Sequence, residues 1–146
     1  MPAPRFVVVE DVDDRPGLGG FVGEVHAQIL RALGCAGYAT NGSVRDLAAV
    51  HDDVGLPLFA SGVVASHAFA HLIEFGTPVV VGGLRVASGD LLFGDASGLQ
   101  SVPPQLVDLL PRVAAELARR DAEVARLCRS PEFSIDALRE LVRSFQ

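Results

Sequence analysis

An arginine and an aspartate stand side by side at Arg45 and Asp46, shortly after an Asn41-Gly42 turn. The planar guanidinium of arginine can bind a carboxylate through two hydrogen bonds, and carboxylate oxygens are the ligands that hard divalent cations prefer. The same stretch also fits a capping box, in which Ser43 caps a helix and Asp46 reaches back to the amide of the cap. Local sequence alone therefore leaves a catalytic and a purely structural interpretation open.

A glycine-rich segment from Gly17 to Glu24 is the second candidate. Glycines between a strand and a helix leave backbone amides unblocked, and the start of a helix favours an anion. The spacing does not fit a dinucleotide fingerprint, and the acidic residues Asp11, Asp13 and Asp14 would repel phosphate. We expect either a site for a small carboxylate or a flexible connection with glycines at tight turns.

Histidines could add acid-base or metal chemistry. His26 lies two residues beyond Glu24, but a lone histidine on a mostly apolar helix is more often a packing residue. His67 and His71 would share a face of either a strand or a helix, although this spacing without a third ligand is a weak zinc signal. His51, beside two aspartates, is expected at the solvated surface.

Composition excludes several kinds of chemistry. All 12 basic residues are arginine, so a Schiff base, a pyridoxal phosphate linkage and a P-loop, which need lysine, are excluded. Cys35 and Cys128 predict neither a disulfide framework nor a zinc knuckle, and we expect two reduced thiols in or near the core. The net charge of −6 argues against nucleic acid as the main ligand. Short apolar runs and the lack of a signal-peptide pattern predict a cytoplasmic protein that does not enter membranes.

The elements that must position these residues alternate in type over the first 60 positions. We expect a strand over 5–10, a helix over 22–33 ended by Gly34, a strand over 36–40 and, after the Arg45-Asp46 stretch and its helix, a strand over 56–60. The order βαβαβ predicts largely parallel strands. Residues 78–86, 90–93 and 99–102 are expected to be short strands of a meander or barrel-like layer, with Asp90 and Asp95 at turns.

The last third of the chain is predicted to be helical. Pro111 should kink or restart the first helix, and Ser134 should cap a final short one. We expect a single domain with an α/β core over residues 1–104 and a helical tail over 105–146 that belongs to the same domain. So long an amphipathic tail is expected to pack against another subunit.

Four motifs occur in order along the chain: Gly23-Glu24, Asn41-Gly-Ser-Val-Arg-Asp46, Gly82-Gly-Leu-Arg-Val86 and Gly89-Asp-Leu-Leu-Phe-Gly-Asp95. Taken together, they resemble the RraA-like family, which groups 4-hydroxy-4-methyl-2-oxoglutarate aldolases with the regulator of ribonuclease E activity A. The resemblance runs from about Phe6 to Pro104. It implies an α/β fold, a swivelling β/β/α sandwich, assembled as a homotrimer or hexamer with active sites between subunits.

The resemblance also implies roles for single residues. Arg45 would bind the carboxylate of a pyruvate moiety, Asp46 would bind Mg²⁺ or Mn²⁺ directly, and Glu24 would hold a metal-bound water. Without lysine, the expected reaction is a metal-dependent (class II) retro-aldol cleavage or decarboxylation of a 2-oxo acid that releases pyruvate, with His26 as a candidate acid or base. Substrate would contact the segment Gly23, Glu24, Val25 and His26, chiefly through backbone amides.

The chain departs from the family pattern in ways that keep alternatives open. Family members carry an additional N-terminal segment, whereas this sequence begins almost directly at the first expected strand. A lysine that some family aldolases place after the metal-binding aspartate has no counterpart here. His26 and the stretch Ser66–His71 are not general family features, which predicts a subgroup with its own substrate. The alternatives are a non-catalytic regulator, which would lack the aspartate found at Asp46, and an inactive short paralogue.

Overall fold

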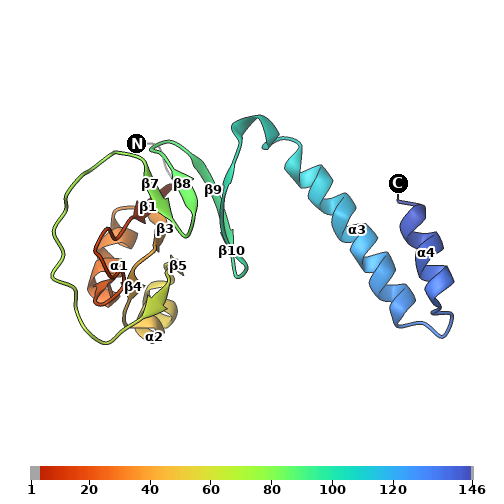
Figure 1. Cartoon of the computed structure of the whole chain (residues 1–146), viewed down its shortest axis with the longest axis horizontal. Coiled ribbons are helices and arrows are strands. Elements are labelled where there is room, and N and C mark those ends of the chain that lie inside the picture. Colours follow the sequence, from red (N-terminus) through yellow and green to blue (C-terminus); the bar gives the residue numbers. More distant parts are fainter. Residues whose placement is uncertain (1–3, 146) are drawn as a thin grey trace. The chain divides into compact units, whose positions relative to one another are not determined.

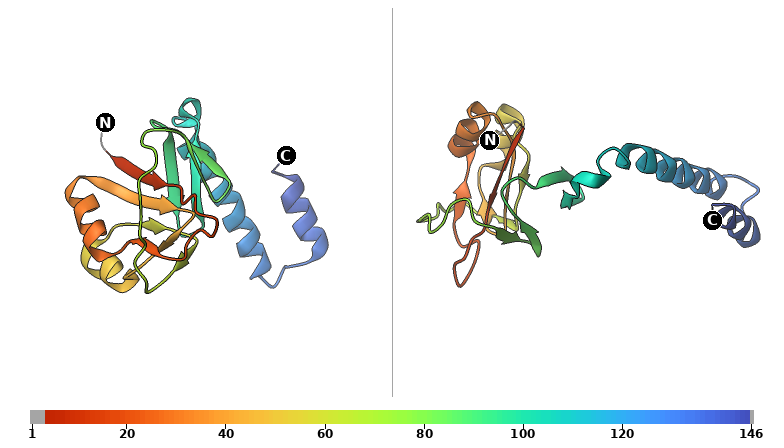
Figure 2. Two further views of the ribbon diagram at one scale, coloured as in Figure 1. Left: turned by 60° about the vertical axis from the view of Figure 1, so that its left-hand side comes forward. Right: turned by 90° about the horizontal axis from the view of Figure 1, so that it is seen from above.

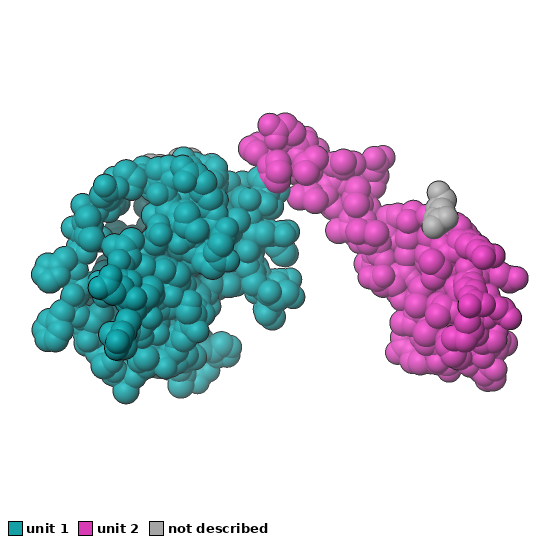
Figure 3. All heavy atoms as spheres, viewed as in Figure 1, with its two compact units in different colours: residues 1–102 teal, residues 103–146 magenta. Residues whose placement is uncertain are grey.

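The computed structural model describes residues 4–145, which form two compact units divided between Val102 and Pro103 (Figure 3). The first unit holds every strand and the helices α1 and α2, and the second holds α3 and α4. Within residues 4–145, none of the helices combines the length and the apolar composition that crossing a membrane requires.

The main sheet of the first unit is parallel, as its βαβαβ order predicts. Its strands are β1 (Arg5–Val9), β3 (Cys35–Thr40) and β5 (Leu58–Phe59), in the spatial order β1-β3-β5. The helix α1 (Glu24–Ala32) connects the first two, and Gly34 follows it with φ +78°, a conformation that glycine adopts without strain. The predicted strands, the helix and its end are therefore confirmed.

A second parallel sheet was not predicted from the sequence. Its strands, β2 (Gly20–Val22), β4 (Ser43–Val44) and β6 (Gly62–Val63), are only two or three residues long and lie in the order β2-β4-β6. Each follows one strand of the main sheet along the chain, so the backbone alternates between the two sheets. The carboxyl ends of β2 and β4 lead into α1 and into α2 (Leu47–Ala49), which continues as the π-helical turn η1 (Val50–Val54).

The core of the first unit fixes these short strands. The helix α1 packs beside η1, and both lie on the same side of the main sheet (Figures 1 and 2). Burying a valine side chain stabilises a fold by about 1.5–3 kcal/mol, so the buried valines at the ends of β2 and β4 hold both ends in place. The buried cluster comprises Val22, Ala27, Tyr38, Val44, Val50, Val54 and Leu56.

Two antiparallel hairpins complete the first unit (Figure 1). The expected single strand over 78–86 is wrong, because Gly82 and Gly83 both have positive φ and form a tight turn between β7 (Val79–Val81) and β8 (Leu84–Val86). The strands β9 (Leu91–Asp95) and β10 (Gly98–Val102) form the second hairpin. The carboxylates of Asp90 and Asp95 accept amide hydrogen bonds within their own turns, as predicted.

The second unit is a helical pair. After the 3₁₀ turn η2 (Pro104–Leu106), α3 (Leu110–Cys128) starts with Pro111 in its first turn, which confirms the predicted restart. The Ser134 hydroxyl accepts the amide of Ala137 at 3.1 Å and caps α4 (Ile135–Arg143), also as predicted. Cys128 is exposed, which corrects its expected place in or near the core, whereas Cys35 is buried.

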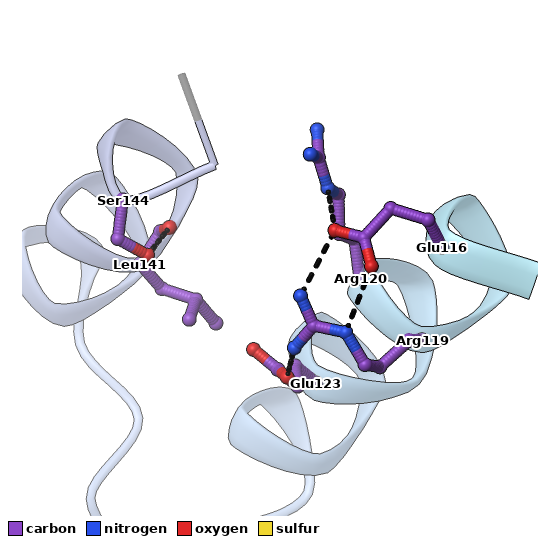
Figure 4. A network of polar contacts seen from close by, with 6 residues as sticks. All are labelled: Glu116, Arg119, Arg120, Glu123, Leu141 and Ser144. Atoms are coloured by element: carbon purple, nitrogen blue, oxygen red, sulfur yellow. Dashed lines mark hydrogen bonds and ion pairs between the residues drawn. The ribbon is translucent and has the colours of Figure 1, made fainter. Parts of the chain in front are cut away.

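A polar network stiffens α3 (Figure 4). Glu116 accepts hydrogen bonds from Arg119 and Arg120, and Arg119 also binds Glu123 one turn further on. Hydrogen bonds from the two guanidinium groups lower the pKa of Glu116 to about 2. These groups are exposed to solvent, so the network contributes mainly to local helix order and is weakened by salt.

Candidate active site

Asp46 has a strained backbone at the centre of the candidate site. It lies between β4 and α2 with φ 56° and ψ 37°, and it is the only non-glycine residue within residues 4–145 with positive φ. The left-handed conformation costs about 1–2 kcal/mol for a residue with a Cβ, although aspartate tolerates it better than most. Strain of this kind is often found at functional sites.

The capping-box interpretation of this stretch is wrong. Ser43 is in strand β4, and its hydroxyl donates to the Gly17 carbonyl at 2.8 Å. The Asp46 carboxylate accepts the backbone amide of Glu24 through Oδ2, at 3.2 Å, and makes no cap to its own helix. The aspartate therefore joins the start of α1 to the start of α2.

The glycine-rich segment makes room for Arg45 and Asp46. A Cβ at Gly20 would lie 2.3 Å from Cγ of Arg45, and a Cβ at Gly23 would lie 2.3 Å from Oδ2 of Asp46 and 3.1 Å from Nε of Arg45. Contacts this short are not possible, so both glycines are required where the two side chains cross the segment. The alternative of a merely flexible connection is not supported at these positions.

The Arg45 guanidinium keeps donors available for a ligand. Its Nη2 lies 3.7 Å from Oδ2 of Asp46, which is an ion pair but too long for a hydrogen bond. The Nε atom is buried and has no hydrogen-bond acceptor within residues 4–145. The side chains of Arg45 and Asp46 are 26% and 41% exposed, so solvent reaches both. A bound carboxylate would supply the acceptors that this guanidinium lacks.

An internal carboxylate occupies the first part of the glycine-rich segment. Asp11 accepts the amides of Gly17 at 2.8 Å and Asp13 at 3.1 Å, and its backbone exchanges two hydrogen bonds with the Asn41 side chain. An external anion is therefore not expected there. The backbone amides at the start of α1 remain available to an external anion, since those of Val25 and His26 have no acceptor within the helix.

The structure brings two of the histidines together. The His26 ring on the first turn of α1 lies 5.2 Å from the Phe21 ring and 6.4 Å from the His67 ring. His67 is held by a parallel bridge to Gly20. His71 lies in an irregular, exposed stretch, so the expected face shared by His67 and His71 is not formed. His51 pairs with Asp52 at the surface, as predicted.

Oxygen ligands for a cation are few but suitable. Within residues 4–145, no group of three or more histidine, cysteine, aspartate or glutamate side chains is placed to hold a metal ion. The Asp46 carboxylate accepts the Glu24 amide through Oδ2, which leaves Oδ1 for a cation. The side chain of Glu24, the first residue of α1, is exposed. Mg²⁺ commonly binds through one or two carboxylates and keeps several waters, so this donor set fits it.

Tyr38 lies in the core beneath this region and takes no part in acid-base chemistry. Burial raises the pKa of Tyr38 to about 12, the Thr40 hydroxyl opposes this shift, and the Asp11 carboxylate adds to it. The phenol therefore stays neutral at any physiological pH.

Sequence reasoning missed the roles of Gly20 and His67. Gly20 pairs with Ser43 on one side and with His67 on the other, and these partners are far away along the chain. No local pattern of residue types indicates such pairings, because each involves a single residue or a strand of two or three residues.

The sequence is similar to proteins of one family. A sequence model of the RraA-like family, described as Aldolase/RraA, matches residues 1–100. A protein of Halalkalibacterium halodurans named "Putative 4-hydroxy-4-methyl-2-oxoglutarate aldolase" is 30% identical over 76 residues, which are 51% of this chain and 36% of that protein. The match thus spans about a third of the curated relative's length.

Solved structures share the fold. An uncharacterized protein from Pseudomonas syringae superimposes with a TM-score of 0.73 at 23% identity, covering 95% of this chain and 68% of that one. Streptomyces coelicolor RraAS2, described as an unusual member of the RNase ES inhibitor RraA protein family, gives 0.64 at 23% identity, covering 84% and 61%. The expected α/β fold with a C-terminal helical tail is confirmed.

Proposed function

The chain belongs to the RraA-like family, and from this membership we propose that it is a divalent-metal-dependent lyase that cleaves or decarboxylates a 2-oxo acid and releases pyruvate. The family description joins aldolases with RraA proteins, so membership alone supports either an enzyme or a regulator. The observation that carries the enzymatic proposal is the placement of Arg45 and Asp46 across Gly20 and Gly23.

Arg45 is proposed to bind the carboxylate at C1 of the substrate. Its buried Nε lacks an acceptor, and a planar guanidinium pairs with a carboxylate in a geometry that lysine cannot reproduce. The amides of Val25 and His26 at the positive end of α1 would add donors for the same acid group or its neighbouring oxygen. Together these groups would hold the 2-oxo acid at the start of α1, beside Gly23.

Asp46 is proposed to hold Mg²⁺ or Mn²⁺ directly through the carboxylate oxygen that Glu24 leaves free, while the Glu24 side chain binds through water. When bound, the cation would supply a Lewis acid that stabilises negative charge on the keto oxygen of the substrate. The left-handed backbone at Asp46 and its bond to the Glu24 amide preorganise the carboxylate, so little rearrangement would be needed to bind the cation.

His26 is proposed to return a proton to C3 after the carbon–carbon bond breaks, which forms the methyl group of pyruvate. It lies on the same first turn of α1 as the substrate-binding amides, and its half-buried ring packs on Phe21. An imidazole exchanges protons efficiently near neutral pH. The same protonation would end either a retro-aldol cleavage or a decarboxylation.

A homotrimeric or hexameric assembly is part of the proposal. The described chain offers few metal ligands, and the helices α3 and α4 have apolar side chains without a single buried residue. A helical pair of this size rarely forms a stable core alone. We therefore propose that its apolar face packs in the assembly, against a neighbouring subunit.

The test is pyruvate release from oxaloacetate and from 4-hydroxy-2-oxo acids, measured with added Mg²⁺ or Mn²⁺ and again with EDTA. We expect turnover that EDTA abolishes and that fresh cation restores. Absence of pyruvate from every substrate, with a folded protein, would favour the alternatives, a non-catalytic ribonuclease regulator or an inactive short paralogue. Inhibition of a ribonuclease by the purified chain would then identify the regulator.

A further inference from the structure

His67 and the Arg45 side chain both lie against Gly20 of β2. Gly20 of β2 pairs in parallel both with Ser43 of β4 and with His67, so three parallel segments lie side by side. A Cβ at Gly20 would lie 2.3 Å from Cγ of Arg45, so the Arg45 side chain crosses the residue with which His67 pairs.

The segment that carries His67 is firmly fixed. The Gly20 amide donates to the Ser66 carbonyl at 2.8 Å, the Ala68 amide donates to the Gly20 carbonyl at 3.1 Å, and the Ser66 hydroxyl donates to the Leu18 carbonyl at 3.0 Å. A Cβ at Gly19 would lie only 2.6 Å from Cα of Ala68. The close approach of two backbones therefore determines where His67 lies.

One nitrogen of the His67 ring takes part in a hydrogen bond, and the other can accept a proton. Nδ1 is within hydrogen-bond distance of the Ala68 carbonyl oxygen, which can only accept a hydrogen bond. Nδ1 must therefore carry the proton, so Nε2 of the neutral ring presents a lone pair. The ring is exposed, and its centroid lies 6.4 Å from that of the tilted His26 ring. This is the arrangement of a base whose tautomer is set by its backbone.

We propose that His67 is the catalytic base that removes the proton from the 4-hydroxyl group of a 4-hydroxy-2-oxo acid, an inference that rests on the function proposed above. Nε2 takes the hydroxyl proton, C4–O becomes a carbonyl, and the C3–C4 bond breaks with its electron pair forming the enolate of pyruvate. His26 or water then protonates C3, and His67 releases its proton to solvent. One substrate gives pyruvate and one carbonyl compound, with no oxidant or reductant.

Decarboxylation provides an internal control for this role. Oxaloacetate loses CO₂ directly from its C4 carboxylate, so no hydroxyl proton has to be removed, while Arg45, Asp46 and His26 serve as before. A base at His67 is therefore needed for retro-aldol cleavage and is dispensable for decarboxylation. The same enzyme preparation reports both reactions, and the decarboxylation confirms that a variant is folded.

The experiment compares His67→Gln and His67→Ala with wild type on 4-hydroxy-4-methyl-2-oxoglutarate and on oxaloacetate, at equal Mg²⁺. We expect kcat for cleavage to fall by about 10²–10⁴-fold in both variants and kcat for decarboxylation to stay within about twofold. Added imidazole should restore part of the cleavage in His67→Ala. His71→Ala is the matched control, because it changes another exposed histidine of the same segment and should alter neither reaction.

Three results distinguish failure of this inference from failure of the proposed function. A wild-type protein that catalyses neither reaction would overturn the proposed function, and this inference with it. A wild-type protein that is active on oxaloacetate, but whose His67 variants lose both activities equally or lose none, would overturn the role of His67 alone. A wild-type protein that decarboxylates oxaloacetate but does not cleave 4-hydroxy-4-methyl-2-oxoglutarate would also overturn the role of His67 alone.

Discussion

The Asp46 carboxylate accepts a hydrogen bond from the Glu24 amide, 3.2 Å away and 22 positions earlier in the chain. This bond joins the starts of α1 and α2, where the two helices leave neighbouring strands of the second sheet. Asp46 has a left-handed backbone and its side chain does not cap α2, so its carboxylate contributes to the contact with α1 and not to helix capping.

Two replacements of Asp46 should distinguish the effect of its backbone strain on stability from the effect of its carboxylate on turnover. Both Asp46→Ala and Asp46→Gly should abolish metal-dependent pyruvate release, because each removes the proposed cation ligand. Glycine adopts φ 56° without strain, so Asp46→Gly should be more stable than Asp46→Ala by about 1 kcal/mol in urea unfolding. Full turnover in either variant would contradict the metal role, and equal stability would contradict the strain.

Arg45→Lys should be nearly as damaging as Arg45→Ala, because a lysine ammonium lacks the two-pronged geometry of the guanidinium. We expect kcat/KM to fall by about 10²–10³-fold in both, measured as pyruvate release. Arg31→Lys, at an exposed position in the last turn of α1, is the control and should behave as wild type. A lysine variant with unchanged kinetics would remove Arg45 from carboxylate binding.

Gly23→Ala should displace the Asp46 carboxylate, since the new Cβ would meet Oδ2 at 2.3 Å. Overpacking of this kind destabilises by about 1–3 kcal/mol, and turnover should fall further than stability explains. The matched control is Gln28→Ala on the exposed side of α1, the helix that Gly23 precedes. Thermal unfolding and pyruvate release are measured on both, and a fully active Gly23→Ala would show that the close approach is not needed for activity.

We expect the protein to lose stability at alkaline pH because Tyr38 is buried. Burial raises the pKa of Tyr38 from 10.0 to about 12, so above pH 10 the unfolded chain releases a proton that the folded chain retains. This contribution is complete below pH 10 and is lost as pH rises to 12, by about 2–3 kcal/mol. Tyr38→Phe should remove this pH dependence from unfolding curves.

The titration of Tyr38 can be followed directly. The chain has one tyrosine and no tryptophan, so ultraviolet absorbance of the phenolate reports this residue alone. An absorbance midpoint at the ordinary value of 10.0 in the folded protein would contradict the assigned burial.

The apolar face of α3 should govern assembly. Leu117 is 53% exposed in the helical pair, and Leu117→Glu should lower the mass found by light scattering if this face packs against a neighbouring subunit. Ala118→Glu places the same charge at the adjacent exposed position and should leave the mass unchanged. An unchanged mass for both would show that other surfaces hold the assembly together.

Local sequence predicted the elements that carry their own periodicity or end signals. The apolar run at β1, the helical spacing of α1 with Gly34 behind it, and the cap at Ser134 act over a few residues, so their types and approximate limits could be read directly. The adjacency of Arg45 and Asp46 alone left a structural and a catalytic interpretation open, and their proposed roles come from the family resemblance.

The geometry of the site depends on contacts between distant parts of the chain. Strands of two or three residues, such as β2 and β4, are too short to show alternation, so their pairing follows from the packing of Val22 and Val44 in a common core. That packing brings Gly20 against Arg45 and His67. The left-handed backbone of Asp46 and the nearby rings of His26 and His67 follow from the same contacts, because no neighbouring residue in the sequence imposes them.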